Sequence, residues 1–355
     1  MKGLIARVGA KADALSIPLN AHLDLTWRCN ERCGHCYLEH RADGEMTTAE
    51  IVDALDQLAE AGTLFLTLSG GEIMLRRDVF EIVSSARERM FDVRLKTNGT
   101  LIGESEARRF ADLGVREVHI SVYSHRPEVH DSATGMPGSL DRSLEAARHL
   151  SRFGVAVALR CLIMQSNSDD YPEIQELARE VGAQARFDVQ VTPRMDGGWE
   201  PVEKYQAAPA TVERVFRDSA VVTDPEGFCA PPPPMNQDAM DGFPCSAGHS
   251  SCYVSPQGDV MPCVQFPWNC GSLRRARFAE IWRNSLEMMK VREVRNRDVA
   301  ICNSCSIFSS CTRCPGLAFQ EGDFAGPSQL ECGKAYGRTG IRSLWSLGEA
   351  APVTT

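Results

Sequence analysis

Two hydrophobic periodicities alternate along the chain between about residue 20 and residue 192. Short apolar runs rich in β-branched residues predict buried strands, and the longer stretches between them carry apolar residues three and four positions apart, which predicts amphipathic helices. We expect strands at 21–26, 64–68, 92–96, 116–122, 156–163 and 186–191. We expect helices at 48–61, 77–89, 104–113, 140–153 and 171–181. This alternation predicts an α/β fold of parallel βαβ units, and the pattern alone leaves a barrel and an open doubly wound sheet as alternatives.

The alternation stops after Pro193. Residues 195–242 are rich in proline, glycine and polar groups. They predict one helix near 210–219 and, at 230–235, an extended and semi-rigid connection. Farther on, 252–263 alternates around a Pro-Gln-Gly-Asp turn, which predicts a β-hairpin. An amphipathic helix is expected at 277–292.

These changes divide the chain into five expected segments. They are an N-terminal extension (1–19), the βα domain (20–194), a linker region (195–242), a cysteine-rich domain (243–335) and a C-terminal tail (336–355). We expect the tail to be poorly ordered from about residue 340.

Composition and charge narrow the classes of partner. The chain has 355 residues, a net charge of -9 and a pI near 5.5. It therefore lacks the basic excess that binding to nucleic acid or to an anionic membrane requires, and a small molecule or a peptide is the expected partner. The N-terminal segment lacks the apolar core of a signal peptide, and no apolar run long enough to cross a bilayer follows it. We expect a cytoplasmic protein without a membrane partner.

The chain contains 14 cysteines, and in a reducing cytoplasm metal binding explains such a number better than disulfides. Three lie close together after the first expected strand, and eight form a second group; the eleven are Cys29, Cys33, Cys36, Cys245, Cys252, Cys263, Cys302, Cys305, Cys311, Cys314 and Cys332. This segregation predicts two metal regions on two domains. The remaining three, Cys161, Cys229 and Cys270, are expected to be buried apolar residues.

The first group reads Cys29-x3-Cys33-x2-Cys36. A closed structural metal site needs four protein ligands, whereas three thiolates hold three irons of a cubane cluster and leave the fourth iron open. A partial zinc site completed by His35 or by a distant residue is the alternative.

This loop resembles the defining motif of radical S-adenosylmethionine (SAM) enzymes, in which an aromatic residue or a histidine precedes the last cysteine, as His35 does here. The resemblance implies that the amino and carboxylate groups of SAM chelate the open iron. An electron from the cluster then cleaves SAM to methionine and a 5′-deoxyadenosyl radical, which abstracts hydrogen from the substrate.

Further motifs at successive strand ends resemble the SAM-binding positions of that family. "LSGGEIM" (68–74) is similar to the Gly-Gly-Glu motif, in which glycines let the ligand lie against the backbone and the glutamate meets the SAM ammonium, although Ile73 stands where the family often has proline. "KTNGT" and "SVYS" follow the next two strands, and a basic residue lies inside the fifth strand, where the resemblance implies contact with the SAM carboxylate and a surface position is the alternative. The implied cofactor-binding residues are Ser69, Gly70, Gly71, Glu72, Asn98, Ser121 and Arg160.

One further arginine and three histidines lie outside the implied set of cofactor-binding residues. Arg194, in the loop 192–198, is a candidate for contact with adenine or substrate. His119, His125 and His130 are expected to be structural or surface groups. No catalytic acid, base or hydrogen donor is identified from the sequence.

The eight C-terminal cysteines resemble the SPASM extension of radical SAM enzymes, which carries two auxiliary 4Fe-4S clusters. The resemblance implies that Cys245, Cys252, Cys263 and Cys314 hold the first cluster and that Cys302, Cys305, Cys311 and Cys332 hold the second. The family usually has three residues before the last clustered cysteine, whereas this chain has two, Thr312 and Arg313. A module that binds two zinc ions is the alternative.

The combined resemblance implies a partial (β/α)6 TIM-type barrel with its cluster at the C-terminal face of the sheet, followed by a small SPASM domain. It also implies three 4Fe-4S clusters, SAM, and an electron donor such as flavodoxin or ferredoxin.

A ribosomally synthesised peptide is the expected substrate, because the arrangement is similar to the maturases of pyrroloquinoline quinone and mycofactocin. The modification would be a crosslink, a thioether or a decarboxylation. The N-terminal extension before the barrel, 1–19, is too short for a winged-helix leader-binding domain, so we expect either a separate leader-binding protein or a substrate without a leader peptide. The alternatives are modification of a tetrapyrrole side chain in haem synthesis, sulfatase-type protein maturation, and a zinc-binding scaffold without enzyme activity.

Overall fold

The computed structural model describes residues 2–41, 43–230, 235–299 and 301–341. Strands and helices alternate through the first half of the chain, as predicted. The strands are β1 (Asn20–Thr26), β2 (Phe65–Gly70), β3 (Asp92–Thr97), β4 (Glu117–Ser121), β5 (Ala156–Leu162) and β6 (Gln184–Asp188). The helices are α2 (Thr48–Glu60), α3 (Val79–Glu88), α4 (Glu104–Asp112), α5 (Pro127–Thr134), α6 (Ser139–Arg152) and α7 (Tyr171–Glu180).

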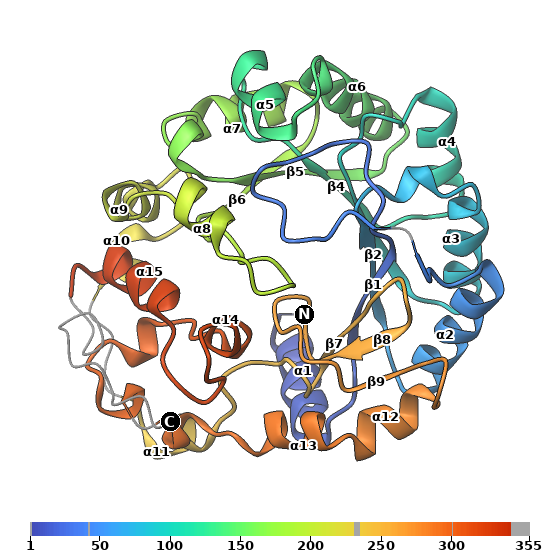
Figure 1. Ribbon diagram of the computed structural model, residues 1–355. Coiled ribbons are helices and arrows are strands. Elements are labelled where there is room, and N and C mark those ends of the chain that lie inside the picture. The colour runs from blue at the N-terminus through green and yellow to red at the C-terminus, as the bar shows by residue number, and fades with distance from the viewer. Residues whose placement is uncertain (1, 42, 231–234, 300, 342–355) are drawn as a thin grey trace.

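Neighbouring strands from β1 to β6 are all parallel. The sheet curves into an incomplete ring with the helices on its outside (Figure 1). The sequence left a barrel and an open sheet as alternatives, and the structure is the partial barrel. Of the helices in this half, α5 was not predicted, because its Pro127 and its short, mostly polar sequence lack the helical apolar spacing.

The two faces of the sheet differ in polarity because side chains alternate along each strand. The outward positions are apolar and pack against the helices in one continuous core, which includes Leu23, Leu25, Leu66, Leu68, Val93, Leu95, Val118, Ile120, Leu159, Ile51, Leu55 and Ile82. The inward positions carry polar and charged groups, among them Asp24, Lys96 and Arg160. The fold therefore encloses a polar interior behind an apolar shell.

The C-terminal half continues the same sheet. β7 (Ser251–Val254) pairs parallel with β1, β8 (Asp259–Met261) pairs antiparallel with β7, and β9 (Gly271–Ser272) pairs with β8. The predicted hairpin at 252–263 is confirmed. Its addition to the free edge of β1 was not predicted, because the pairing of two strands from opposite halves of the chain leaves no local signal in the sequence.

A buried hydrogen-bond network holds this junction together. The Tyr253 hydroxyl on β7 donates to Asp24 Oδ2 on β1 (2.8 Å), and the Trp27 indole N–H donates to the same oxygen (3.2 Å). Asp24 and Tyr253 are fully buried, so the cysteine-rich half is anchored to the barrel interior.

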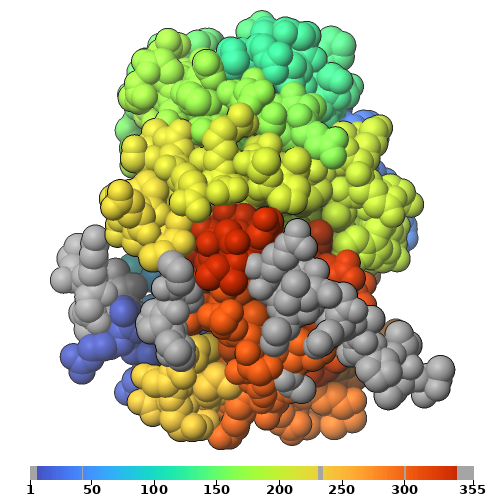
Figure 2. Space-filling model, turned by 90° about the vertical axis from the view of Figure 1, so that its left-hand side faces the viewer, coloured from blue at the N-terminus to red at the C-terminus, as the bar shows by residue number. Residues whose placement is uncertain are grey.

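The segment predicted as a linker, 195–242, is largely helical in its described part. It contains α8 (Glu200–Tyr205), α9 (Pro209–Arg217), α10 (Pro225–Cys229) and α11 (Gln237–Asp241), of which α9 corresponds to the helix predicted near 210–219. α9 packs against α15 (Gln329–Thr339). Val212 on α9 lies so close to Gly337 on α15 that a Cβ on Gly337 would be 2.8 Å from Val212 Cγ1. Figure 2 shows the red surface of α15 directly beside this yellow segment.

Two sequence expectations reach beyond the described residues. The proline run of the predicted connection, 231–234, lies outside them, as do residues 342–355 of the predicted tail. The start of that tail belongs to α15, which continues to Thr339.

The single helix predicted at 277–292 is wrong. The structure has two helices, α12 (Phe278–Asn284) and α13 (Leu286–Glu293), separated by Ser285 in an extended conformation. The Ser285 hydroxyl accepts a hydrogen bond from the Met288 N–H (3.3 Å), so the serine starts a new helix as its N-cap. The remaining elements are α1 (Lys2–Leu15), α14 (Pro315–Gln320) and the short 3-10 helices η1 (Ile73–Leu75), η2 (Gln165–Asn167), η3 (Asn296–Asp298), η4 (Cys302–Ser304) and η5 (Phe308–Ser310).

Among the described residues, none of the helices has both the length and the apolar character needed to cross a bilayer.

Tyr253→Phe should destabilise the protein by about 1–2 kcal/mol, because it leaves Asp24 buried with one donor fewer. Chemical unfolding under anaerobic conditions measures the change. Tyr336→Phe is the matched control, because the Tyr336 hydroxyl makes no side-chain hydrogen bond within the described residues. Equal stability of the two variants would show that the Asp24 network does not hold the junction.

Candidate active site

One cavity in the barrel interior collects the carboxyl ends of the parallel strands. Its volume is about 280 Å³, and it is lined by the three N-terminal thiols together with residues from β2, β3, β4 and β5. Six of the seven predicted cofactor-binding residues line it: Ser69, Gly70, Gly71, Asn98, Ser121 and Arg160. The seventh, Glu72, does not.

The cysteine loop that follows β1 is held from two sides. The Arg32 N–H donates to the Thr134 carbonyl at the end of α5 (2.8 Å). On the other side, the Tyr205 hydroxyl of α8 packs so tightly against Gly34 that a Cβ on this residue would lie only 2.0 Å from the hydroxyl oxygen. Neither support was foreseen, because both come from elements distant in sequence. Gly34 is thus required by packing against Tyr205.

The three thiols lie close enough to act on one another electrostatically. The pKa of Cys29 is raised to about 12, mainly by burial, and the charge of Cys36 contributes to this rise. Burial likewise raises the pKa of Cys33 far above its usual range, with contributions from Cys36 and Cys29. Burial lowers the pKa of the neighbouring His35 to about 4, so this ring is neutral at physiological pH.

This donor set fits an iron-sulfur cluster. Within the described ranges, no three His, Cys, Asp or Glu side chains converge closely enough to hold a single metal ion. Ligands of a cubane cluster bind different irons, so they surround a volume and need not converge on one point. Cys29, Cys33 and Cys36 meet this condition, because they are half-buried on the wall of one cavity and all three donors are thiols.

The Gly70-Gly71 turn packs against the start of the cysteine loop. A Cβ on Gly70 would lie 2.1 Å from the Thr26 carbonyl oxygen, and a Cβ on Gly71 would lie 2.3 Å from that of Arg28. The Gly71 N–H also donates to the Thr26 carbonyl (2.7 Å). We expected these glycines to make room for a ligand, whereas the space of their missing side chains is filled by the protein's own backbone. The turn therefore positions the cysteine loop.

Glu72 is fully buried and serves the neighbouring loop. Its carboxylate accepts hydrogen bonds from the Asn98 N–H (2.8 Å), the Thr97 hydroxyl (2.8 Å) and the Met74 N–H (2.9 Å). Burial raises its pKa, and these hydrogen bonds oppose that rise. We expected Glu72 to meet the SAM ammonium, and in the structure its carboxylate is hydrogen-bonded to Thr97 and Asn98 and does not line the cavity.

Asn98 links this loop to the cysteines. Its side-chain amide donates to Asn30 Oδ1 (2.8 Å) and lies 4.0 Å from Cys29 Sγ. Glu72, Asn98 and the cysteine loop thus form one connected unit.

Two basic side chains project into the cavity from inward strand positions. Arg160 on β5 makes no ion pair within the described residues, and burial lowers its pKa while the nearby Asp188 raises it. Lys96 on β3 was not identified from the sequence as a candidate site residue. The feature that identified Arg160, a charged residue within an apolar strand, was present at Lys96 as well. Burial lowers the pKa of Lys96, and the charge of Asp24 opposes this.

Arg194 lies outside this cavity. It forms an ion pair with Asp196 (2.9 Å) and lines a separate surface pocket. Two of the three histidines have structural partners: His119 is hydrogen-bonded to Glu117 (2.9 Å), and His130 accepts from the Tyr123 N–H (3.1 Å).

The C-terminal cysteines separate into two spatial groups. The pKa of Cys314 is raised to about 12, mainly by burial, and the charges of Cys263 and Cys245 contribute to this rise. Burial raises the pKa of Cys252 to about 12, with a contribution from Cys263. Cys314 therefore lies with these three cysteines, although it follows Cys311 closely in the sequence.

The second group consists of the remaining four. The pKa of Cys302 is raised to about 11, mainly by burial, and the charges of Cys332 and Cys305 contribute to this rise. Burial raises the pKa of Cys311 to about 12, with contributions from Cys332 and Cys302. The structure thus brings together the same two sets of four that the resemblance implies.

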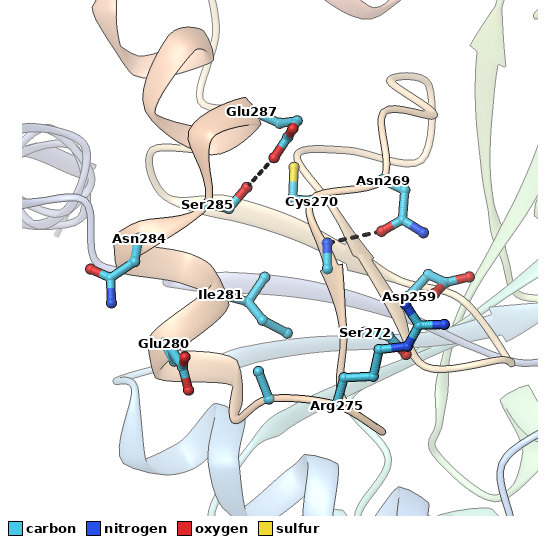
Figure 3. A pocket seen from close by; sticks show the side chains of 12 residues that line it. Asp259, Asn269, Cys270, Ser272, Arg275, Glu280, Ile281, Asn284, Ser285 and Glu287 are labelled. Carbon is cyan, nitrogen blue, oxygen red and sulfur yellow. Dashed lines mark hydrogen bonds between the residues drawn. The ribbon is translucent and has the colours of Figure 1, made fainter.

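A second, more open groove of about 590 Å³ lies between β9 and the helices α12 and α13 (Figure 3). Its wall includes Cys270, whose thiol is buried and donates to the Trp268 carbonyl (3.4 Å). None of the eleven candidate cysteines lines this groove. Cys161 and Cys229 are also buried, as expected.

Comparison with known proteins gives the family. The radical SAM superfamily model matches residues 24–185, and the model of the SPASM iron-sulfur cluster-binding domain matches residues 245–306. An AdoMet-dependent heme synthase of Methanosarcina barkeri is 29% identical over 323 residues, covering 83% of this chain and 90% of that protein. The mycofactocin maturase MftC of Mycobacterium tuberculosis is 28% identical over 309 residues, covering 84% of this chain and 78% of that protein.

The fold is shared with a solved peptide-bound enzyme. Streptococcus suis SuiB bound to its precursor peptide SuiA superimposes with a TM-score of 0.73 at 16% identity, covering 93% of this chain and 79% of that chain. With the cysteine loop, the parallel barrel and the two family models in agreement, the chain is a radical SAM enzyme with a C-terminal SPASM iron-sulfur domain, and its cofactors are 4Fe-4S clusters and SAM.

Proposed function

We propose that this protein is a radical SAM/SPASM oxidoreductase that modifies a ribosomally synthesised peptide. The observation that carries the chemistry is that three thiols share one cavity with Arg160, a guanidinium that makes no ion pair within the described residues. The charged residues that line the same cavity are the reason to prefer a peptide to a tetrapyrrole as the substrate.

The proposed roles in SAM binding follow from where each residue lies. Cys29, Cys33 and Cys36 would hold the cluster, which when bound supplies the electron that cleaves SAM to methionine and a 5′-deoxyadenosyl radical. Arg160 binds the carboxylate of SAM, since a carboxylate is the natural partner of an unpaired guanidinium. Asn98 and Ser121 orient the rest of the ligand from the adjacent strand ends.

Ser69, Gly70 and Gly71 contribute the remaining wall of the SAM site. Glu72 acts as a positioning residue for Asn98, because its carboxylate is engaged in hydrogen bonds within the protein.

The two cysteine groups of the SPASM domain would each hold one auxiliary cluster. The first uses Cys245, Cys252, Cys263 and Cys314, and the second uses Cys302, Cys305, Cys311 and Cys332. With four cysteines each, neither cluster has an open iron, so the proposed role is electron transfer. Each turnover begins with an electron, and the proposal therefore includes an external donor of the flavodoxin or ferredoxin type. A separate leader-binding protein is its remaining partner.

The charges inside the cavity favour a peptide over a tetrapyrrole. Two acidic residues, Glu31 and Asp188, line the cavity with two basic ones, Lys96 and Arg160. Burial raises the pKa of Glu31 to about 7, so that this carboxyl is only partly ionised at neutral pH, and burial lowers the pKa of His35 and His40, so that neither ring adds a full positive charge. With Arg160 assigned to SAM, one cation remains for the substrate. A tetrapyrrole with several carboxylates needs a surplus of positive charge, which this cavity lacks.

Modification of a tetrapyrrole is the second candidate. It is favoured by the similarity to heme synthases, in which the alignment covers most of both chains. Sulfatase-type maturation, the oxidation of a cysteine or serine in a protein, is a third reaction that the same assays separate.

Replacement of Cys29, Cys33 and Cys36 by alanine should lower the iron content after anaerobic reconstitution from about twelve to about eight per chain and abolish 5′-deoxyadenosine formation. Iron analysis and chromatography of the products measure both. Cys270→Ala, which removes a buried thiol outside the three groups, should change neither. Zinc in place of iron, or full iron content in the triple variant, would contradict the proposal.

Separate incubations with each candidate substrate distinguish a peptide-modifying enzyme from a tetrapyrrole-modifying one. The reconstituted enzyme with SAM and a reductant should form 5′-deoxyadenosine above the uncoupled background with a precursor peptide encoded beside its gene, and the mass of that peptide should change. A propionate-bearing tetrapyrrole should leave the background unchanged. Stimulation by the tetrapyrrole alone would replace the first candidate by the second.

Lys96→Met should reduce the yield of modified peptide about tenfold or more, because the cavity loses the cation that we assign to the substrate and with it a charge-assisted hydrogen bond. Uncoupled SAM cleavage should stay within about twofold, and Lys96→Arg should restore part of the yield. Arg94→Met is the control, since Arg94 lies on the same strand, pairs with Glu117 (2.9 Å) and does not line the cavity. An equal loss of uncoupled cleavage in Lys96→Met would assign Lys96 to SAM instead.

A further inference from the structure

The shortened spacing in the cysteine-rich domain places an arginine between two cluster sites. Arg313 lies in the sequence Cys311-Thr312-Arg313-Cys314, and its two flanking cysteines belong to different spatial groups. The Arg313 side chain is 2% exposed, so its charge is held inside the protein. A buried guanidinium requires partners.

Only part of this guanidinium has partners in the protein. Nη2 donates to the carbonyl oxygens of Phe324 (2.6 Å) and Gly326 (2.9 Å). Nε and Nη1 of Arg313 are buried and have no hydrogen-bond partner among the described residues. Buried donors are almost always satisfied in native proteins, so these two point to an acceptor that the polypeptide itself does not supply.

The surrounding charges indicate what that acceptor is. No carboxylate in the described part of the chain forms an ion pair with Arg313, and the nearby Glu331 is already paired with Lys334 (2.6 Å). Burial lowers the pKa of the guanidinium, whereas Cys302 and Cys311 of one group, Cys314 of the other and, last, Asp323 raise it. Asp323 forms no ion pair with Arg313 within the described residues and accepts from the Ala325 N–H (2.9 Å), so the acceptors left for the unpaired N–H groups are the sulfur ligands of both proposed clusters.

We infer that Arg313 is a positioning residue shared by the two auxiliary sites, where its unpaired N–H groups donate hydrogen bonds to sulfur and its charge stabilises the reduced state of both clusters. This inference rests on the proposed function, because it requires two clusters to be present. Each one-electron reduction adds one negative charge to a cluster, so a fixed positive charge beside it raises the reduction potential. Because one arginine lies between the two clusters, a change in its charge should shift the reduction potentials of both.

In this arrangement the two-residue spacing between Cys311 and Cys314 explains how Arg313 comes to lie between the two groups of cysteines. Arg313 directly precedes Cys314, whose side chain joins the first group, and its own backbone N–H lies 3.4 Å from Cys311 Sγ of the second group. The short segment thus holds one cation against both sets of ligands.

The test is an EPR-monitored redox titration of the full-length, anaerobically reconstituted protein. The auxiliary signals are isolated by working in the Cys29/Cys33/Cys36→Ala background. Arg313→Gln should move both auxiliary signals to lower potential, and Arg313→Lys, which keeps the charge but loses the planar fork, should move them less. In the protein with all its cysteines, the signal of the SAM-binding cluster should not move. Arg283→Gln, which removes an exposed charge from α12, should leave all signals in place.

The outcomes separate this inference from the function on which it rests. A parent protein that binds no auxiliary iron refutes the proposed cluster sites themselves. With auxiliary iron intact, unchanged potentials in Arg313→Gln, or a shift of only one signal, overturn the shared role. If Arg313→Gln loses iron from both sites, then Arg313→Lys decides: retained iron and potentials support the role of the charge, and equal loss overturns it.

Discussion

The pairing of β1 with two neighbours is the constraint on which the rest of this structure depends. β1 pairs with β2 on one side and with β7 on the other, so that Ala21 lies opposite Cys252 and Leu23 opposite Val254. The same strand runs directly into the cysteine loop. One strand therefore sets the distance between the thiols that face the barrel cavity and those of the SPASM domain. Hydrogen bonds from Tyr253 and Trp27 to the buried Asp24 secure this register.

The polarity of the barrel interior follows from the alternation of side chains along the strands. Apolar outward positions bury enough surface against the helices to hold the sheet, which leaves the inward positions free for charged groups. Lys96, Asp24 and Arg160 lie there in surroundings that shift the pKa values of the two basic groups downward. Asp24 is fully buried, Arg160 is half-buried and Lys96 is exposed toward the cavity. Charges that are partly removed from water are costly unless a ligand or a counter-charge compensates them, and this cost is the physical reason to regard the cavity as a binding site.

Fold and substrate are separate questions in this family. Proteins with names as different as heme synthase and mycofactocin maturase resemble the chain to almost the same degree. The barrel positions the cluster and SAM, whereas the substrate is selected by side chains at a few inward positions and in the loops around them. The near neutrality of the cavity lining is therefore more informative about the substrate than the fold is.

The sequence by itself determined the α/β class, the order of the six barrel strands and of five helices between them, the family and the iron-sulfur and SAM cofactors. These properties are encoded in local periodicity and in the spacing of Cys29, Cys33 and Cys36, which a reader of the chain sees directly. The break at Ser285 was missed because a capping serine inside an apolar repeat is a weak local signal.

Only the tertiary structure decided how distant segments meet. It placed β7 beside β1, put Tyr205 against Gly34, engaged Glu72 in hydrogen bonds with the Asn98 loop and brought Cys314 to the cysteines around Cys263. The assignment of Cys314 and of the SAM-binding residues remains a prediction that these positions support. Contacts between segments from opposite halves of the sequence depend on the packing of the whole chain, and packing leaves no periodic trace in the sequence.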